Sequence, residues 1–353
     1  MSVMDARVQA AIDHWAPRFV QAGVDVNEFQ TTTAGIERWE DWLDAWCEVA
    51  DAHAERAREA ESAARRITAG DAWLRAAVAY HFAKFVWVLD AGRSRAAAER
   101  AVEALAAAHR LLDPTAERIE APMDGHRVVA NLRRPALLDR PPLVVIIPGL
   151  DSTKEEFFGL EEVFLRRGMA TLSLDGPGQG ETGFDVPIRP DYEVGVAAAL
   201  DMLDGREDLD LDRIGAFGVS LGGYYAPRAA AFEPRIRAVV GLSGPTNFGE
   251  VWDGLPELTR ETFVHKSAAA DDEDGRRRAL ELDLEGVLQR LEQPALFVTG
   301  ERDRLIPAEQ TRRQAELAPN GSYVGFPEGN HGCANIPWLA RPLYADWLAE
   351  RLA

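Results

Sequence analysis

The chain has 353 residues, of which 46% are hydrophobic and 27% are charged, and its formal net charge is −19. This composition is typical of a globular protein, and the length leaves room for two domains. The acidic excess argues against nucleic acid and anionic membrane surfaces as partners, because both require clustered Lys and Arg.

Targeting and metal-binding signals are absent from the sequence. Charged residues interrupt the first twenty positions, and no run of eighteen apolar residues occurs. The two cysteines, Cys47 and Cys333, lie far apart and lack the spacing of metal ligands. We therefore expect a cytoplasmic protein without a metal site.

Residues 1–115 predict a helical domain. Apolar residues such as Trp42 and Trp46 recur there at helical spacing. Residues 71–89 predict a helix with apolar side chains on two sides, which indicates burial on both, and residues 96–112 predict another helix. We interpret this region as a cap or dimerisation domain.

Residues 116–353 predict a second domain of the α/β class. A hairpin is expected around Asp124-Gly125, and strands then alternate with helices, which is typical of a mostly parallel sheet covered on both faces. The interval 244–290 breaks this alternation and is long enough to form a lid. The expected strands are 118–121, 128–132, 143–147, 170–174, 213–218, 238–242, 295–299 and 323–326, and the expected helices are 154–167, 192–203 and 308–317.

The strongest chemical signal is the segment Gly218-Val219-Ser220-Leu221-Gly222. It follows an expected strand and precedes an expected helix, so Ser220 lies on a sharp turn where its hydroxyl is presented as a nucleophile. The flanking glycines permit close backbone packing at such a turn. Together with the strand and helix pattern, this motif predicts an α/β-hydrolase fold with an N-terminal cap and a lid insertion.

A serine nucleophile needs a histidine base that is oriented by a carboxylate, and in this architecture the chain order is Ser, acid, His. Asp303 follows the expected strand 295–299, and His331 follows the last expected strand, so both lie at the same edge of the sheet as Ser220. Glu301 is the competing acid, and Asp303 is preferred because it lies deeper in its loop. The predicted triad is therefore Ser220, Asp303 and His331.

The oxyanion formed during acyl transfer needs two backbone N–H donors. One is expected from Leu221, directly after the nucleophile, and the other from Leu150, in the loop after strand 143–147. Residues 175–180 resemble a phosphate-binding loop but lack its Gly-Lys-Ser/Thr ending, so they are interpreted as a tight turn.

Four segments together resemble one group of α/β-hydrolases. They are Gly149 to Glu156, Arg167-Gly168-Met169-Ala170, the Asp-Gly-Pro-Gly-Gln-Gly turn at residues 175–180, and Ser220-Leu221-Gly222-Gly223. The group includes 2,6-dihydroxypseudooxynicotine hydrolase and fungal polyketide-shortening hydrolases. The resemblance extends loosely into the helical region around Tyr80-His81-Phe82.

This resemblance implies cleavage of a carbon–carbon bond in a ketone substrate without any cofactor, in an enzyme that forms a homodimer. It also implies that the substrate binds between the cap and the catalytic domain. A lid acid, Glu250, Asp253 or Glu257, is a further possibility that no motif decides. The candidate substrate-binding residues are Tyr80, His81, Glu250, Trp252 and Glu257.

Two alternative functions remain open at this point. The same triad could cleave an ester, lactone or thioester, or release or cyclise a polyketide-like chain. A non-catalytic binding protein on the same scaffold is the third hypothesis, although all three triad positions are filled. The small-molecule partner is therefore a ketone or an ester.

Overall fold

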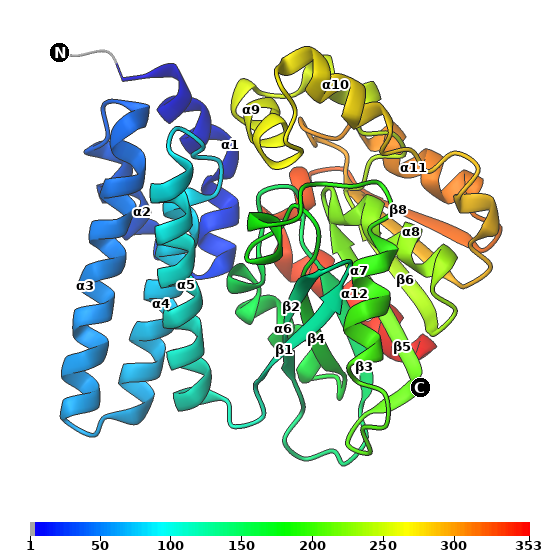
Figure 1. Cartoon of the computed structure of the whole chain (residues 1–353), viewed down its shortest axis with the longest axis horizontal. Helices are drawn as coiled ribbons and strands as arrows, with labels where there is room; N and C mark the ends of the chain where they lie inside the picture. Colours follow the sequence, from blue (N-terminus) through cyan, green and yellow to red (C-terminus); the bar gives the residue numbers. More distant parts are fainter. Residues whose placement is uncertain (1–3) are drawn as a thin grey trace. The chain divides into compact units, whose positions relative to one another are not determined.

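The computed structural model describes residues 4–353 (Figure 1), so the first three residues of the predicted cap lie outside it. The chain divides into two compact units. One contains the residues up to Ala116 together with Glu155–Gly159, and the other contains Glu117–Lys154 and Leu160–Ala353. The short segment at 155–159 thus leaves the second unit and packs with the first.

The helical unit is organised around an aromatic core. Phe19 stacks on Phe82 with ring centroids 3.7 Å apart, and Trp42 and Trp46 pack around this pair. Such ring contacts stabilise a core beyond the area that they bury. The helices are α1 (Ala6–Ala22), α2 (Val26–Ala34), α3 (Trp42–Ser62), α4 (Arg66–Lys84) and α5 (Ala91–Leu112), with the 3-10 turn η1 (Trp39–Asp41).

The helix predicted at residues 71–89 begins and ends five residues earlier than expected. It is α4, which ends at Lys84. Phe85 and Trp87 are buried beyond its end, and Trp87 Nε1 donates to the carbonyl of Trp39 at 3.0 Å. The apolar pattern therefore continues past the helix because the following turn also packs into the core.

The second unit contains an eight-stranded sheet in the order β1-β2-β4-β3-β5-β6-β7-β8. The hairpin β1–β2 is antiparallel, with Met123 opposite His126, and β2 pairs antiparallel with β4. All remaining pairs are parallel, which confirms the mostly parallel sheet. The strands are β1 (Glu117–Met123), β2 (His126–Arg133), β3 (Pro142–Ile147), β4 (Ala170–Asp175), β5 (Asp210–Val219), β6 (Ile236–Leu242), β7 (Ala295–Gly300) and β8 (Gly321–Phe326).

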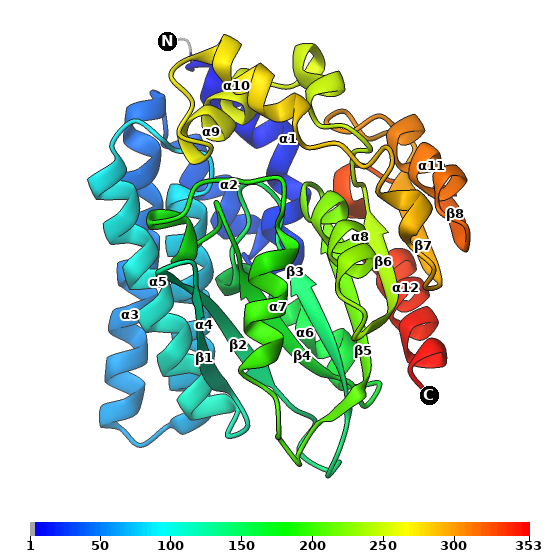
Figure 2. The same cartoon turned by 45° about the vertical axis from the view of Figure 1, so that its right-hand side comes forward.

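Helices cover both faces of this sheet (Figures 1 and 2). On one face, α7 packs on β1 and β2, and α8 packs on β5 and β6. On the other face, Phe217 of β5 contacts Phe164 of α6 and Tyr344 of α12. Because both faces are covered, the central parallel strand β3 is apolar along its whole length. These helices are α6 (Phe158–Leu165), α7 (Glu193–Asp201), α8 (Gly222–Phe232), α11 (Ala308–Leu317) and α12 (Pro337–Arg351).

The expected lid insertion leaves the sheet after β6 and returns before β7. It contains the 3-10 turns η4 (Gly249–Gly254) and η5 (Leu288–Arg290) and the helices α9 (Glu257–Lys266) and α10 (Asp272–Leu280). In Figure 2 these two helices, drawn in yellow, lie beyond one edge of the sheet. The predicted helix at 154–167 is divided instead into the 3-10 turn η2 (Lys154–Glu156) and α6.

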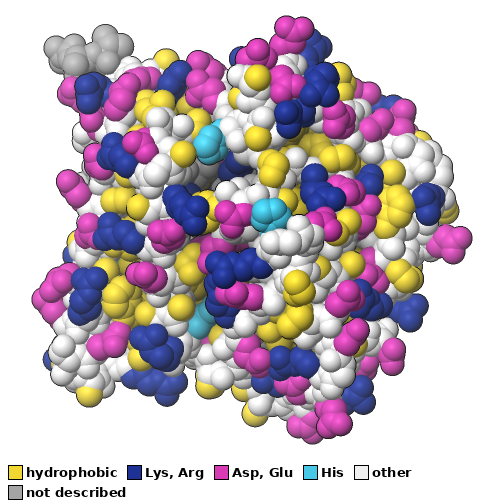
Figure 3. Space-filling view, in the orientation of Figure 1, with side chains coloured by type: hydrophobic (Ala, Val, Ile, Leu, Met, Phe, Trp, Pro, Cys, Tyr) yellow, Lys and Arg dark blue, Asp and Glu magenta, His cyan; other side chains and the backbone are white. Residues whose placement is uncertain are grey.

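The surface of the described residues carries charges of both signs. On the face drawn in Figure 3, acidic and basic side chains are interspersed. Many of them form ion pairs, for example Arg118 with Glu181 and Arg228 with Glu193. Between residues 4 and 353, no helix has both the length and the apolar character needed to cross a bilayer.

Candidate active site

Ser220 lies on a sharp turn between β5 and α8. Its φ of 59° is in the left-handed region, which costs a non-glycine residue about 1–3 kcal/mol. Its N–H donates to the carbonyl of Leu242 at 2.8 Å. A Cβ on Gly222 would collide with the carbonyl oxygen of Ile147, so only glycine allows α8 to start this close to β3.

Asp303 and His331 form a hydrogen-bonded pair. Nδ1 of His331 donates to Oδ2 of Asp303 at 2.7 Å, and Oδ1 accepts the N–H groups of Leu305 and Ile306 at 2.9 and 3.0 Å. Burial opposes ionisation of Asp303, but His331 and the two N–H groups outweigh it and hold the pKa of this carboxyl below its usual value. His331 is therefore oriented by a carboxylate that is ionised at neutral pH.

The competing acid, Glu301, points elsewhere. A Cβ on Gly325 of β8 would lie 2.5 Å from Oε1 of Glu301, so this carboxylate is directed along the neighbouring strand. Glu301 is also exposed, whereas the side chain of Asp303 is fully buried. The geometry therefore favours Asp303 as the partner of His331.

The loop of His331 lies against the turn of Ser220. A Cβ on Gly332 would be 3.3 Å from Cγ2 of Val219, so the residues next to the base and next to the nucleophile are in contact. The N–H of Gly332 donates to Oγ of Ser243 at 3.1 Å, which ties this loop to the end of β6. Within residues 4–353, no hydrogen bond joins the hydroxyl of Ser220 to the His331 ring, and such bonds often form only when substrate is bound.

The predicted oxyanion donors flank the nucleophile. A Cβ on Gly149 would be 2.9 Å from Cβ of Ser220 and 3.4 Å from its Oγ, so the peptide that joins Gly149 to Leu150 adjoins the hydroxyl. Leu221 directly precedes α8, where the helix N-terminus favours negative charge. Among the described residues, the N–H groups of Leu150 and Leu221 donate to no backbone carbonyl.

Two side chains outside the predicted site bind the carbonyls of the loop at 148–150. Gln179, in the turn after β4, donates to the carbonyls of Pro148 and Gly149 at 2.6 and 3.2 Å. Lys266, at the end of α9, donates to the carbonyl of Leu150 at 2.7 Å. The Asp-Gly-Pro-Gly-Gln-Gly motif was a signal for Gln179, but the sequence offers no local signal for Lys266.

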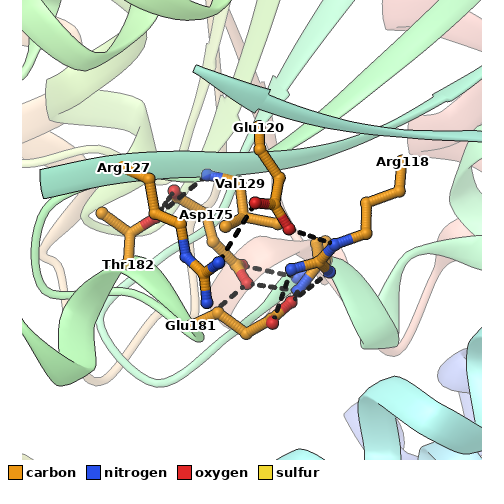
Figure 4. Close-up of polar contacts among 8 residues, drawn as sticks. Arg118, Glu120, Arg127, Val129, Asp175, Glu181 and Thr182 are labelled. Carbon is orange, nitrogen blue, oxygen red and sulfur yellow. Dashed lines mark hydrogen bonds and ion pairs between the residues drawn. The ribbon is translucent and has the colours of Figure 1, made fainter. Parts of the chain in front are cut away.

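The turn after β4 is fixed by a group of ion pairs, some buried and some partly exposed (Figure 4). The Lys154 ammonium lies 2.7 Å from both Asp175 and Glu181, and Arg118 forms a further ion pair with Glu181. Oδ1 of Asp175 also accepts the N–H of Lys154 at 2.9 Å. Because Asp175 and Glu181 are already paired with Lys154 and Arg118, we interpret these ion pairs as stabilising the turn.

The candidate substrate-binding residues of the lid have different surroundings. Glu250 is exposed and pairs with Arg313 at 3.0 Å. Trp252 is 1% exposed and packs edge-on against Phe263, so it belongs to the core of the insertion. Glu257 is exposed in the first turn of α9. Their roles toward substrate stay predictions.

The two candidates in the helical unit are engaged with their neighbours. The hydroxyl of Tyr80 donates to Asp51 at 2.5 Å, and burial raises the pKa of Tyr80 to about 12. His81 is fully buried with Nε2 3.1 Å from Glu156, and burial together with Lys84 lowers its pKa to about 4. His81 is therefore neutral at pH 7, and the substrate contacts of both residues also stay predictions.

Comparisons with known proteins agree with this architecture. The model of the FrsA-like esterase family matches residues 19–312. The chain is 34% identical to the 2,6-dihydropseudooxynicotine hydrolase of Paenarthrobacter nicotinovorans over 88% of this chain and 84% of the relative. It is 31% identical to the α/β-hydrolase XenA of Xenoacremonium sinensis, over 72% of this chain and 66% of that relative.

The crystal structure of 2,6-dihydroxy-pseudo-oxynicotine hydrolase superimposes with a TM-score of 0.88 at 32% identity. The match covers 96% of this chain and 95% of that structure, so it includes the helical region as well as the sheet. The expected α/β-hydrolase fold is thereby confirmed. The chain belongs to the FrsA-like esterase family and is a hydrolase of the α/β type.

Proposed function

We propose that this enzyme is a serine hydrolase that cleaves a carbon–carbon bond next to a ketone carbonyl through an acyl-enzyme on Ser220. The observation that carries the proposal is the strained turn of Ser220 beside a loop in which His331 is bonded to buried Asp303. The similarity to a relative named 2,6-dihydropseudooxynicotine hydrolase supports a ketone as the substrate class.

The first half of the reaction forms the acyl-enzyme. Ser220 attacks the ketone carbonyl while His331 accepts the hydroxyl proton, and Asp303 holds the imidazole in the required tautomer. The N–H groups of Leu150 and Leu221 bind the resulting oxyanion. Collapse of the tetrahedral intermediate breaks the carbon–carbon bond, and the leaving carbanion takes a proton from the imidazolium. A second carbonyl or an aromatic ring on the leaving group stabilises this carbanion.

The second half of the reaction releases the acid. Water attacks the acyl-enzyme while His331 accepts one of its protons, and the same two N–H groups bind the second oxyanion. Collapse of this intermediate breaks the bond to Oγ of Ser220, which takes a proton from the imidazolium. The products are a carboxylic acid and the protonated leaving fragment. Every step uses groups of the protein and water alone.

The alternative function is hydrolysis of an ester, a lactone or a thioester by the same three residues. The match to an esterase family favours this alternative. An alkoxide or thiolate leaves more readily than a carbanion, so an enzyme that cleaves activated ketones also cleaves simple esters at some rate. Release or cyclisation of a polyketide-like chain belongs to the same class of acyl transfer.

A fluorophosphonate probe tests whether Ser220 is the nucleophile. We expect the native protein and Ser322→Ala to be labelled with one probe per chain, and Ser220→Ala to remain unlabelled, because only an activated serine reacts. Ser322 is an exposed serine on β8 and serves as the matched control. Labelling of Ser220→Ala, or none of the native protein, would remove the basis of the proposal.

A panel of substrates distinguishes cleavage of a carbon–carbon bond from cleavage of an ester bond. It compares β-diketones and aryl ketones with simple aryl esters, and product masses identify the cleaved bond. We expect at least one diketone or ketone to be cleaved into a carboxylic acid and the protonated leaving fragment. We expect Ser220→Ala to lack this activity. Rapid turnover of many esters and of no diketone would establish the esterase alternative.

The partner is proposed to be a small-molecule ketone or ester. The homodimer and the cytoplasmic location expected from the sequence stay predictions. Light scattering after size-exclusion chromatography measures the mass of the assembly. A mass of about twice the 38.8 kDa of one chain is the expected result.

A further inference from the structure

The side-chain amide of Gln179 is buried and uses all of its hydrogen-bonding groups. The residue is 1% exposed. Its Nε2 donates to the carbonyls of Pro148 and Gly149 at 2.6 and 3.2 Å. Its Oε1 accepts the N–H of Gly176 at 3.0 Å and the hydroxyl of Tyr192 at 2.6 Å. Only an amide side chain offers two donors and an acceptor in this arrangement.

The bond to Gly149 controls the direction of the Leu150 N–H. A trans peptide is planar, and its C=O and N–H groups point in opposite directions. Since Gln179 binds the carbonyl of Gly149, the N–H of Leu150 is directed away from Gln179. The Cβ position of Gly149 lies 3.4 Å from Oγ of Ser220, so this peptide is next to the nucleophile.

Glycine at position 149 makes such a restraint necessary. The close approach to Ser220 excludes a side chain there, and glycine has the greatest backbone freedom of any residue. A rotated peptide would turn the carbonyl of Gly149, rather than the N–H of Leu150, toward the developing oxyanion. A carbonyl oxygen in that position would repel the oxyanion instead of stabilising it.

Gln179 is itself held from both ends of its turn. Tyr192, which donates to its Oε1, is fully buried and stacks on Tyr225 with ring centroids 4.1 Å apart. Asp175, at the start of the turn, accepts the N–H of Glu181 at 3.2 Å and binds the ammonium of Lys154. The amide therefore has a defined position from which to orient the loop.

We propose that Gln179 is a positioning residue that keeps the N–H of Leu150 directed at the oxyanion formed when Ser220 attacks. The inference rests on the proposed function, because the oxyanion arises only if Ser220 is the nucleophile. Gln179 touches no reacting atom and acts through the Gly149–Leu150 peptide. Replacement of Gln179 therefore lowers kcat, while the binding of substrate is retained.

The first test compares Gln179→Met with the control Gln293→Met, using p-nitrophenyl acetate. Gln293 also donates to a backbone carbonyl, that of Ala230 at 2.9 Å near the far end of α8. We expect kcat of Gln179→Met to fall about 10²-fold with KM changed less than about threefold, as for loss of one oxyanion donor. Gln293→Met is expected to keep the native kcat. Native kcat in Gln179→Met, or equal losses in both variants, overturns the inference.

A milder variant covers the case in which Gln179→Met does not fold. Tyr192→Phe removes only the hydroxyl that donates to Gln179 and keeps the ring stacked on Tyr225. We expect kcat to fall about fivefold at unchanged KM, because one buried hydrogen bond that holds the amide is lost. A rise in KM at native kcat contradicts the proposed role.

The pH dependence of Gln179→Glu separates orientation from packing. The ionised carboxylate can only accept hydrogen bonds and faces two carbonyl oxygens, whereas the protonated acid donates one bond and still accepts. We expect the ratio of its kcat to the native kcat to rise as the pH falls. The same ratio for Gln179→Met is expected to stay constant, and a constant ratio in both variants argues against the inference.

Selective ¹⁵N-leucine labelling observes the Leu150 amide without any turnover. Leu150→Ile assigns its signal by removing it. We expect the signal to shift in Gln179→Met and to stay in place in Gln293→Met. If the native protein reacts with neither ester nor fluorophosphonate, the proposed function fails, while this signal still reports whether Gln179 orients the peptide. An unchanged Leu150 signal in Gln179→Met overturns the inference by itself.

Discussion

Ser220 and Ser243 are both held in left-handed backbone at the ends of the neighbouring strands β5 and β6. Their φ angles are 59° and 50°. Each such conformation costs about 1–3 kcal/mol for a residue other than glycine, so the surrounding fold must over-determine it. Ser243 accepts the N–H of Gly332, the neighbour of His331, which connects its strained position to the predicted base.

Replacement of Ser243 tests whether its hydroxyl, through the bond to Gly332, helps to position His331. We expect Ser243→Ala to lower the free energy of unfolding by about 1 kcal/mol, because the half-buried N–H of Gly332 loses its acceptor. We also expect kcat to fall about tenfold as the loop of His331 loosens. Urea unfolding and p-nitrophenyl acetate kinetics measure the two effects.

Ser243→Gly is the matched control for Ser243→Ala. It removes the same hydroxyl but relieves the left-handed strain, so it is expected to be about 1 kcal/mol more stable than Ser243→Ala. Its kcat is expected to fall as in Ser243→Ala. Native kcat in both variants would show that the hydroxyl of Ser243 has no part in placing His331.

The turn between β4 and α7 is held in place by ion pairs. Lys154 is 2% exposed and bridges Asp175, at the end of β4, to Glu181. Arg118 of β1 binds Glu181 from the solvent side, where its side chain is 36% exposed. The two cations therefore differ in how much water screens them.

This difference predicts unequal costs for two substitutions. Lys154→Met leaves two carboxylates without their buried cation and is expected to destabilise the protein by about 3–5 kcal/mol. Arg118→Met removes a partly solvated partner and is expected to cost about 1 kcal/mol or less. Urea unfolding at neutral pH measures both values. Equal costs would show that Lys154 contributes no more than a surface ion pair.

Glu181 predicts a pH dependence of stability. Burial opposes its ionisation, but Arg118 and Lys154 outweigh burial and lower its pKa to about 2, from an ordinary value of 4.5. A depressed pKa in the folded state contributes stability that is present above pH 4.5 and is lost as the pH falls toward 2. We therefore expect Glu181→Gln to be destabilised relative to the native protein at pH 7 and the gap to narrow below pH 4.5. Urea titrations at pH 7 and at acid pH measure the gap, and a gap independent of pH contradicts the assignment.

At the scale of the whole molecule, the chain crosses between its two units near residue 154. Lys154 is held in the second unit by Asp175 and Glu181. Glu156, two residues later, belongs to the helical unit, where Arg18 donates two hydrogen bonds of 2.7 Å to it. Burial opposes ionisation of Glu156, but Arg18 and His81 outweigh burial and lower its pKa. Each side of this crossing is thus anchored by a buried ion pair.

We expect the two units to unfold in one transition because of this anchored crossing. Tryptophan fluorescence reports mainly on the helical unit, and fluorophosphonate labelling reports on the second unit. The two urea curves should coincide, which is the usual test for a single cooperative transition. Separate midpoints would show that the units unfold independently. Six of the nine tryptophans lie in the helical unit: Trp15, Trp39, Trp42, Trp46, Trp73 and Trp87.

All eight expected strands are present, and the helix expected at 308–317 matches α11, whereas the helix expected at 154–167 is divided. The strand expected at 143–147 is β3, which begins one residue earlier, and the strand expected at 213–218 is β5, which begins three residues earlier and ends one residue later. Buried parallel strands are continuous apolar runs that turn residues interrupt, so their limits are visible locally. The helix expected at 154–167 instead divides at Phe157, within a segment, 155–159, that belongs to the helical unit rather than to the unit of the sheet.

By itself, the sequence determined the α/β class and the strand–turn–helix around Ser220. Apolar periodicity and the need for glycine at a close approach are local properties, so they can be read along the chain. Only the tertiary structure decided that His331 bonds Asp303 rather than Glu301, and that Gln179 and Lys266 hold the carbonyls of the loop at 148–150. These contacts join residues that are distant in the chain, and no local pattern records which of several polar side chains the packing of strands and helices brings together.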